Sequence, residues 1–294
     1  MTHVYTRSFR VRGYECDALG HLNNAVYQHY CEQASIEASE DAGYPMDWYE
    51  THGTAWVIRR MSIEYLQSVV AGDVLEVTTW VSGWRGVRAQ REYEMRWQAD
   101  SALVARASAE WVYLDRATGR PRRIPSEVAD LIGAGGERVV RPYRLPAQGV
   151  EAGTFRWRHQ VKRYELDAMQ HVNNAVYLNW VEEAKFRAAE AAGWPVERMR
   201  AENFVTVQIR HDTEYLLPAR YGDEIEIVSR LYDLRRVRGT WLHEIYRVGG
   251  GELLARNYST GAFLNLEGRP MPAPPAMLDA LLRGEPLPHS PNLC

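Results

Sequence analysis

The order of hydrophobic and polar positions predicts one long helix near the start of the chain. Over residues 25–42, apolar and small side chains recur every three or four positions, which places them on one face of a helix. Gly43 and Pro45 follow as a stop signal, because neither residue continues a helix well. Asn23 and Asn24 precede the pattern, and asparagine side chains readily accept hydrogen bonds from the first N–H groups of a helix. The pattern therefore predicts an asparagine-capped helix of about five turns.

The stretches that follow this helix have the pattern of antiparallel strands. Apolar and polar positions alternate with a period of two over residues 89–97 and again over residues 103–113. Residues 74–81 are rich in residues that favour strands, and the turn at residues 83–86 joins them to the next strand. One helix followed by a strand meander predicts a sheet wrapped around that helix.

The same patterns return in the second half of the chain at a constant offset of 150 residues. About 24 of the 60 aligned positions from Tyr14 to Asp73 are identical in the two halves, whereas average composition would give roughly one in sixteen by chance. Two repeated pairs are Glu64-Tyr65 with Glu214-Tyr215, and Gly72-Asp73 with Gly222-Asp223. A period as long as a whole domain indicates a duplicated domain.

Length and composition place the boundaries between the two copies. The 294 residues are enough for two domains of ordinary size, and glycines and prolines interrupt the periodic patterns between the copies. We expect a first domain over residues 1–135, a linker over residues 136–154, a second domain over residues 155–285 and a C-terminal tail over residues 286–294.

Composition and charge argue against several other classes of protein. No apolar run approaches the roughly 20 residues that span a bilayer, and the polar N-terminal stretch has no apolar core of an export signal, so we expect a cytoplasmic protein without a membrane span. The formal net charge of −3 gives no electrostatic case for binding nucleic acid. Three cysteines without metal-ligand spacing predict neither a disulfide framework nor a metal site.

The repeated string resembles the motif of a known family. Residues 14–24 read Tyr-Glu-Cys-Asp-Ala-Leu-Gly-His-Leu-Asn-Asn, with Tyr27 following, and are similar to the motif of hotdog-fold thioesterases of the 4-hydroxybenzoyl-CoA thioesterase and acyl-CoA thioester hydrolase class. Residues 165–174 are similar and lean toward the plant acyl-acyl-carrier-protein thioesterases. The resemblance covers residues 5–120 and 155–269. It implies an α+β fold, a tandem (double) hotdog in which each half is a long helix wrapped by an antiparallel β-sheet and the halves form an internal pseudodimer.

The resemblance also implies a function. It predicts a thioesterase that hydrolyses an acyl-CoA or related acyl thioester to a free acid and a thiol, without a cofactor. An acyl-carrier-protein thioester is the alternative substrate. Since one fold hosts several functions, an acyl-thioester-binding protein without turnover and a hotdog hydratase or dehydratase are further alternatives. The identity of the acyl group and any further homo-oligomer stay open at this point.

The candidate catalytic residues lie in the repeated string. Thioester hydrolysis needs a base or nucleophile at the carbonyl group and donors for the oxyanion that develops. Asp17 lies seven residues before Asn24, at the predicted start of the helix, and N–H groups of a first helical turn can polarise a carbonyl. By the resemblance, Asp17 and Asp167 are the base or nucleophile, and N–H groups near Asn24 and Asn174 form the oxyanion site. A purely structural role as a turn cap is the alternative for each aspartate.

A histidine follows each aspartate by four residues. As neutral imidazoles, His21 and His171 suit a general base, and a hydrogen bond that shapes the loop is an equally good interpretation. The plant-type pattern has asparagine two residues after the aspartate, where this chain has Leu19 and Met169. This departure counts against the plant carrier-protein mechanism.

Candidate substrate contacts come from arginine and tryptophan. Arg88 and Arg238 are predicted to meet the phosphates of coenzyme A or of a phosphopantetheine arm, against the alternative of a solvated strand face. Trp56 is predicted to line an acyl pocket, against the alternative of core packing. Glu15 and Glu165 lie two positions before each aspartate, where an extended strand would place them on the same face, as a paired carboxylate that aids the base. A surface charge is the favoured interpretation.

Overall fold

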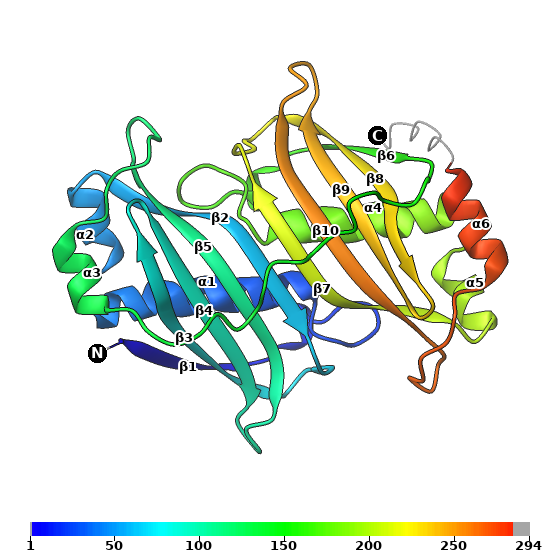
Figure 1. Ribbon diagram of the computed structural model, residues 1–294, viewed down its shortest axis with the longest axis horizontal. Coiled ribbons are helices and arrows are strands. Elements are labelled where there is room, and N and C mark those ends of the chain that lie inside the picture. The colour runs from blue at the N-terminus through cyan, green and yellow to red at the C-terminus, as the bar shows by residue number, and fades with distance from the viewer. Residues whose placement is uncertain (1, 285–294) are drawn as a thin grey trace. The chain divides into compact units, whose positions relative to one another are not determined.

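The chain folds into two units of matching architecture. The computed structural model describes residues 2–284, so the expected tail over residues 286–294 lies outside the described residues. The chain divides between Pro142 and Tyr143 into two compact units, which are called here the first and the second unit. This division falls within the expected linker over residues 136–154. Each unit has five strands and one long helix (Figure 1).

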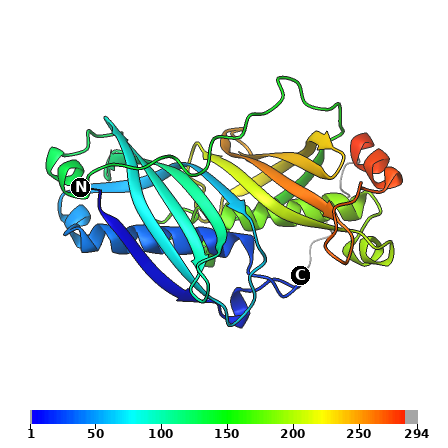
Figure 2. The ribbon, with the colours of Figure 1, turned by 60° about the horizontal axis from the view of Figure 1, so that its bottom comes forward.

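In the first unit the antiparallel strands lie in the order β1-β3-β4-β5-β2. The elements are β1 (Val4–Arg10), α1 (Asn24–Asp41), α2 (Met46–Thr51), β2 (Thr54–Tyr65), β3 (Val74–Arg85), β4 (Arg88–Trp97), β5 (Leu103–Asp115) and α3 (Ser126–Ile132), with a 3-10 turn at Gly13–Glu15. The helix and the three strands predicted from the periodicity are confirmed as α1, β3, β4 and β5. Figure 2 shows α1 lying along one face of its sheet.

The second unit repeats this order, with strands β6-β8-β9-β10-β7. Its elements are β6 (Phe155–Gln160), a 3-10 turn at Arg163–Glu165, α4 (Val176–Ala191), α5 (Val196–Ala201), β7 (Val205–Tyr215), β8 (Glu224–Arg235), β9 (Arg238–Arg247), β10 (Leu253–Leu264) and α6 (Pro275–Arg283). Within residues 2–284, no helix is both long and apolar enough to cross a membrane.

The helix-facing side of the first sheet is mostly apolar. Leu75 and Val77 of β3 and Met95 of β4 are fully buried, because alternate residues of a strand point to the same face. Tyr93 lies on the same face, and its hydroxyl group hydrogen-bonds Ser35 of α1 at 2.8 Å. The periodic residues of the helix and of the strands therefore meet in one core.

The second unit buries Ile225, Ile227 and Ile245 at the corresponding positions, but its interior also holds a group of polar side chains. His243 of β9 is buried between the hydroxyl groups of Ser229, 2.7 Å from Nδ1, and Ser259, 3.0 Å from Nε2. His211 of β7 is buried beside Asn257, with 3.3 Å between Nδ1 and Oδ1. Burial and, next, the charge of Lys185 lower the pKa of His211 to about 3. Both rings are therefore neutral members of a hydrogen-bonded interior.

The segment that follows α3 is fastened to the first sheet. The carboxylate of Glu92, fully buried on β4, accepts hydrogen bonds from the Val139 amide at 3.0 Å and from the Ser82 hydroxyl at 2.8 Å. The Ser108 hydroxyl also donates to this carboxylate and accepts a hydrogen bond from the Val140 amide at 3.0 Å. Part of the expected linker is thus bound tightly to the first unit.

Candidate active site

Asp17 lies in a tight turn that leads into α1. Its Oδ1 accepts hydrogen bonds from the amides of Leu19 at 2.8 Å and His21 at 3.1 Å. The Gly20 amide donates to the Asp17 carbonyl at 3.0 Å, and Gly20 has a φ of +83°, a conformation that glycine adopts at little cost. Asp17 therefore caps its own turn through one oxygen. Its other oxygen, Oδ2, makes no hydrogen bond to any residue in the described part of the chain.

The turn of Asp167 has the same geometry. Oδ1 of Asp167 accepts hydrogen bonds from the amides of Met169 at 2.8 Å and His171 at 3.2 Å. The Gln170 amide donates to the Asp167 carbonyl at 3.0 Å, and Gln170 has a φ of +61°, which is uncommon for a residue with a side chain. The turn-cap role is therefore present in both units, and in both it uses only one carboxylate oxygen.

The first asparagine of each repeated pair caps the start of the helical segment. Asn23 accepts a hydrogen bond from the Ala25 amide at 2.8 Å, and Asn173 accepts one from the Ala175 amide at the same distance. In the first unit α1 begins at Asn24, as predicted. In the second unit the regular helix α4 begins two residues later than the repeat implies, after a turn.

The second asparagine of each pair is held by a tyrosine from the sheet. Tyr65 of β2 donates a hydrogen bond to the Asn24 carbonyl at 3.2 Å, and Tyr215 of β7 donates one to the Asn174 carbonyl at 2.9 Å. The sequence interpretation did not include these tyrosines among the functional residues. The repeated Glu-Tyr pair was the signal that could have identified them.

A second tyrosine lies in the first turn of each long helix. The Tyr177 hydroxyl accepts a hydrogen bond from the Ala219 amide at 3.1 Å, and burial raises the pKa of Tyr177 to about 12. Burial, followed by the charge of Asp73, also raises the pKa of Tyr27. Both hydroxyl groups therefore stay protonated at neutral pH; that of Tyr177 holds the segment before β8, and the Tyr27 ring packs edge-on against Tyr65.

The two predicted histidines have different surroundings. His171 is half-buried, and its Nε2 lies 3.2 Å from Nη2 of Arg220. Burial first, and then the charge of Arg220, lower the pKa of His171, while Asp167 opposes this effect. His21 is exposed, and Val70 occupies the position that Arg220 has in the second unit. The structure thus brings each Asp, His and Asn-Asn set together but gives the two histidines different neighbours.

The expectation that Glu165 is a surface charge is wrong. Its carboxylate is buried and accepts hydrogen bonds from Trp180 Nε1 at 2.9 Å and from the Lys162 amide at 2.6 Å. Glu15 is also mostly buried, and it accepts a hydrogen bond from the Tyr30 hydroxyl at 2.8 Å. These carboxylates tie the loop to the helix. The sequence did not show this, because the groups that cover them come from separate segments.

The structure places Arg88 far from the aspartate of its own unit. Arg88 is the first residue of β4, and it pairs with Glu110 at 3.2 Å. The loop of Asp17 lies at the other end of β4, where Trp97 contacts the segment that bridges to this loop. A strand of this length spans about 30 Å. Arg238 has the same place at the start of β9, so phosphate binding by either arginine stays a prediction.

Trp56 packs in the core of the first unit. Its ring centroid lies 4.9 Å from that of Tyr113 and 6.3 Å from that of Trp84. The Trp84 indole in turn donates a hydrogen bond to the Gly133 carbonyl at 2.8 Å. In this structure the Trp56 side chain therefore packs against other core residues. Its role in an acyl pocket stays a prediction.

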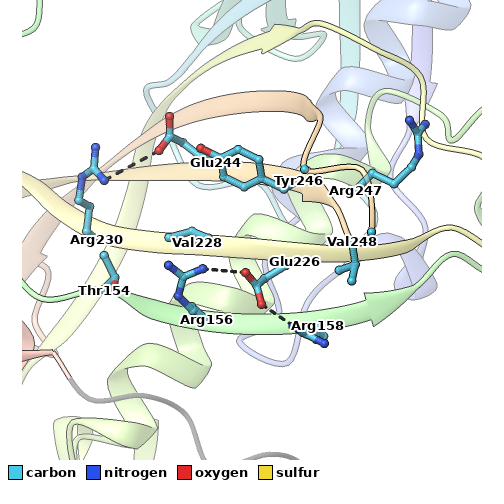
Figure 3. Close-up of a pocket in the computed structure, with 12 residues that line it drawn as sticks. Thr154, Arg156, Arg158, Glu226, Val228, Arg230, Glu244, Tyr246, Arg247 and Val248 are labelled. Carbon is cyan, nitrogen blue, oxygen red and sulfur yellow. Dashed lines mark hydrogen bonds and ion pairs between the residues drawn. The ribbon is translucent and has the colours of Figure 1, made fainter.

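An open groove of about 510 Å³ lies over β6, β8 and β9, away from the predicted catalytic residues. Figure 3 shows that it is crossed by ion pairs, with Arg156 at 2.7 Å from Glu226 and Arg230 at 3.8 Å from Glu244. Such pairs on a solvated sheet face are individually weak. One lining residue, Arg247, also bonds Asp223 at 3.0 Å, which links the groove to the segment beside His171.

A family model described as the thioesterase-like superfamily matches residues 11–132 and residues 161–281. The chain belongs to this superfamily. The two matched segments coincide with the two units, and each unit has the helix and antiparallel sheet of a hotdog domain. The predicted tandem hotdog fold is therefore confirmed.

Two curated relatives of this thioesterase-like chain come from the plant Arabidopsis thaliana. It is 27% identical over 201 residues to the chloroplastic palmitoyl-acyl carrier protein thioesterase of Arabidopsis thaliana, a match that covers 62% of this chain and 47% of the relative. It is 25% identical over 201 residues to the chloroplastic oleoyl-acyl carrier protein thioesterase 1 of the same plant, covering 61% and 54%. The chain spans about half the length of these relatives.

Solved structures show the same fold along most of the chain. A structure from Lactobacillus plantarum has a TM-score of 0.77 and 20% identity, and the match covers 92% of this chain and 98% of that one. The 12:0-ACP thioesterase from Umbellularia californica has a TM-score of 0.71 and 18% identity, with coverage of 88% and 93%. At this level of identity, the likeness concerns the fold.

Proposed function

We propose that this protein is a hydrolase that cleaves acyl thioesters to a free acid and a thiol. Membership in the thioesterase-like superfamily and the names of its curated relatives support this class of reaction. The observation that carries the proposal is the duplicated aspartate turn. In both units one carboxylate oxygen is fixed by two backbone amides, and the turn leads directly into the start of the long helix.

The carboxylate can act in either of two ways. As a general base, Asp17 or Asp167 takes a proton from water while the water oxygen attacks the thioester carbon, and the C–S bond then breaks to release a thiolate that is protonated. As a nucleophile, the carboxylate displaces the thiolate to form an anhydride, which water then hydrolyses. In both routes the amides bound to Oδ1 orient the carboxylate, and backbone N–H groups near Asn24 and Asn174 stabilise the oxyanion.

The substrate is proposed to carry its acyl group on a phosphopantetheine thiol. Acyl-CoA and acyl-carrier-protein thioesters share this arm, so the same aspartate turn serves both. Acyl-CoA remains the main proposal. The acyl-carrier-protein thioester is the second candidate, because the curated relatives are named acyl-carrier-protein thioesterases.

A panel of thioesters tests the proposal. Acyl-CoA and acyl-carrier-protein substrates with short, long and aromatic acyl groups are incubated with the purified full-length chain, and the released thiol is titrated with a chromogenic disulfide. We expect thiol and free acid in equal amounts for at least one series. Conversion of an enoyl-CoA without thiol release would instead indicate a hydratase, and tight binding without thiol release would indicate a binding protein.

A further inference from the structure

The side chain of Arg220, in the second unit, contacts the ring of His171. Its Nη2 lies 3.2 Å from His171 Nε2, and no carboxylate within the described residues forms an ion pair with its guanidinium group. Arg220 is on the exposed segment between β7 and β8, whereas His171 is half-buried in the Asp167 loop. An arginine without an acidic partner thus contacts a predicted catalytic residue directly.

The segment that carries Arg220 is fixed in place from two sides. The Ala219 carbonyl accepts a hydrogen bond from the Val172 amide at 2.9 Å. Arg247 of β9 donates to the Pro218 carbonyl at 2.8 Å and to Asp223 at 3.0 Å, and Asp223 also accepts from the backbone amide of Arg220 at 2.9 Å. The position of Arg220 is therefore built into the fold.

The first unit provides an internal comparison. Its corresponding segment is also held by an aspartate, but Val70 stands in place of Arg220. There Asp73 accepts hydrogen bonds from the Val70 amide at 3.0 Å and from Trp97 Nε1 at 3.4 Å. Val70 is the counterpart of Arg220, and the backbone bridge from His21 to Val70 shows that it reaches the same place. Within residues 2–284, no side chain forms a hydrogen bond with the His21 ring.

The chemistry of the two side chains fixes the state of His171. An arginine only donates hydrogen bonds and is always charged, so Nε2 of His171 must accept with its lone pair. The proton of the neutral ring is then on Nδ1. Protonation of His171 would remove this acceptor and place two cations in contact, which is unfavourable.

We propose that Arg220 is a positioning residue that holds His171 as a neutral imidazole with its proton on Nδ1, and that it thereby makes the two sites of the chain chemically different. In the second unit Nε2 is occupied, so Asp167 is the base or nucleophile and the Nδ1–H group of His171 acts as a hydrogen-bond donor. In the first unit, no side chain within residues 2–284 occupies Nε2 of His21. The catalytic part of this inference rests on the proposed thioesterase function, whereas the state of His171 does not.

The charged groups around His171 agree with this assignment. Arg220 faces the ring from the segment before β8 and favours the neutral form, and Asp167 on the ring's own loop favours the charged form. Behind Arg220, Arg247 and Asp223 form an ion pair at 3.0 Å and largely compensate each other. Burial adds to the effect of Arg220 and is the larger cause of the lowered pKa of His171.

Nuclear magnetic resonance of the full-length chain tests the inference without any substrate. Long-range proton–nitrogen spectra of histidine rings distinguish the two neutral tautomers and follow protonation with pH, and a His171→Gln variant assigns the signal. We expect the Nδ1–H tautomer in the wild type. Arg220→Val places the residue of the first unit at this position. The His171 ring should then no longer be held in the Nδ1–H tautomer, and the pH at which it becomes protonated should rise.

Two further variants separate charge from hydrogen bonding. Arg220→Gln keeps a donor but removes the charge, so the tautomer should persist while the titration moves to higher pH. Val70→Arg should impose the Nδ1–H tautomer on His21. A wild-type His171 with its proton on Nε2, or a titration that is unchanged in Arg220→Val, would overturn the proposal.

Activity then tests the catalytic consequence. In an Asp17→Asn background, which leaves only the second site, Arg220→Val should move the acid limb of the kcat profile to higher pH. Arg158→Gln, in the groove over β6, is the matched control and should leave the profile in place.

If the wild type releases no thiol, the proposed function fails while the resonance result still decides the state of His171. If thiol is released but the acid limb does not move, the catalytic consequence is wrong.

Discussion

Tyr215 donates a hydrogen bond of 2.9 Å from β7 to the carbonyl oxygen of Asn174. Asn174 belongs to the turn whose N–H groups are the proposed oxyanion donors, and its own carbonyl is thereby fixed to the sheet. Tyr65 and Asn24 form the same pair in the first unit at 3.2 Å. The position of each oxyanion turn therefore depends on a strand as well as on the helix.

Removal of this hydroxyl group should weaken catalysis without unfolding the protein. In the Asp17→Asn background, Tyr215→Phe is expected to lower kcat several-fold, because a small shift of the oxyanion donors costs transition-state binding. The free energy of unfolding should fall by only about 0.5–1.5 kcal/mol. Urea unfolding and thiol release measure the two effects. Tyr164→Phe, at a highly exposed tyrosine, should change neither.

Replacement of the two aspartates tests the proposed chemistry. Asp17→Asn and Asp167→Asn should each leave part of the wild-type turnover, and the double variant should lose roughly 10² to 10⁴-fold. Asparagine keeps the Oδ1 that accepts the two loop amides, so the turn should survive and the loss should reflect the missing charge. The control is Asp100→Asn, since Asp100 makes a similar turn bond to the Ala102 amide at 2.9 Å.

The outcome of this experiment also decides how many sites work. If one single variant is inactive and the other unaffected, only one unit is catalytic. A double variant with wild-type turnover would contradict a catalytic role for the aspartates and would leave their turn-cap role as the whole explanation.

The buried histidines of the second unit should make stability depend on pH. His211 is protonated in the unfolded chain below its ordinary pKa of 6.5 but stays neutral in the fold until about pH 3. Its contribution is therefore complete above pH 6.5 and is lost as the pH falls from there toward 3, by about 1.4 kcal/mol per pH unit.

His211→Met removes this dependence, because Met61 occupies the same position in the first unit and is buried there. Between pH 7 and pH 5, the free energy of unfolding should fall by about 2 kcal/mol less in this variant than in the wild type. Urea unfolding at both pH values gives the comparison, and His52→Gln at an exposed position serves as the control. Equal losses in His211→Met and wild type would show that His211 is not buried in its neutral form.

Loss of the Glu92 carboxylate should release the segment fastened to β4. Glu92→Ala leaves the Val139 amide and the Ser108 hydroxyl without their acceptor, and leaves the Ser82 hydroxyl only the Gln90 carbonyl at 3.4 Å, at a cost of about 1–3 kcal/mol. Trypsin should then cut after Arg138 much faster than in the wild type. Glu94→Ala changes a partly exposed neighbour on the same strand and should leave the cleavage rate unchanged. Equal protection of both variants would mean that other contacts hold the segment.

The periodic parts of the fold could be predicted from the sequence because their side chains follow local rules. The helix α1 and the strands β3, β4 and β5 each bury one face, and this leaves a period of three to four or of two in the chain. The Asp17 turn could be predicted because duplication preserved it at a constant offset. The short helices α3 and α6 were not predicted as helices, since each has only a few turns.

Other features depend on contacts between distant segments. Glu165 has the composition of a surface residue, yet Trp180 and His159 cover it from elsewhere in the chain. Arg220 gave no signal because the repeat comparison highlights identical positions, and here the counterpart is Val70. A difference between two copies becomes informative only when the structure shows what the changed side chain contacts.

The attachment of residues 139–140 to Glu92 also determines where the gene can be divided. On the other side of the boundary, the Val150 amide donates to the Tyr232 carbonyl at 2.8 Å, which anchors that stretch to β8. A division between Pro142 and Tyr143 keeps each anchored stretch with the sheet that it covers. Composition alone placed the end of the first domain at residue 135. A division there would separate Val139 and Val140 from Glu92 and Ser108, which they bond. Half-length genes for shuffling or complementation should therefore meet at Pro142.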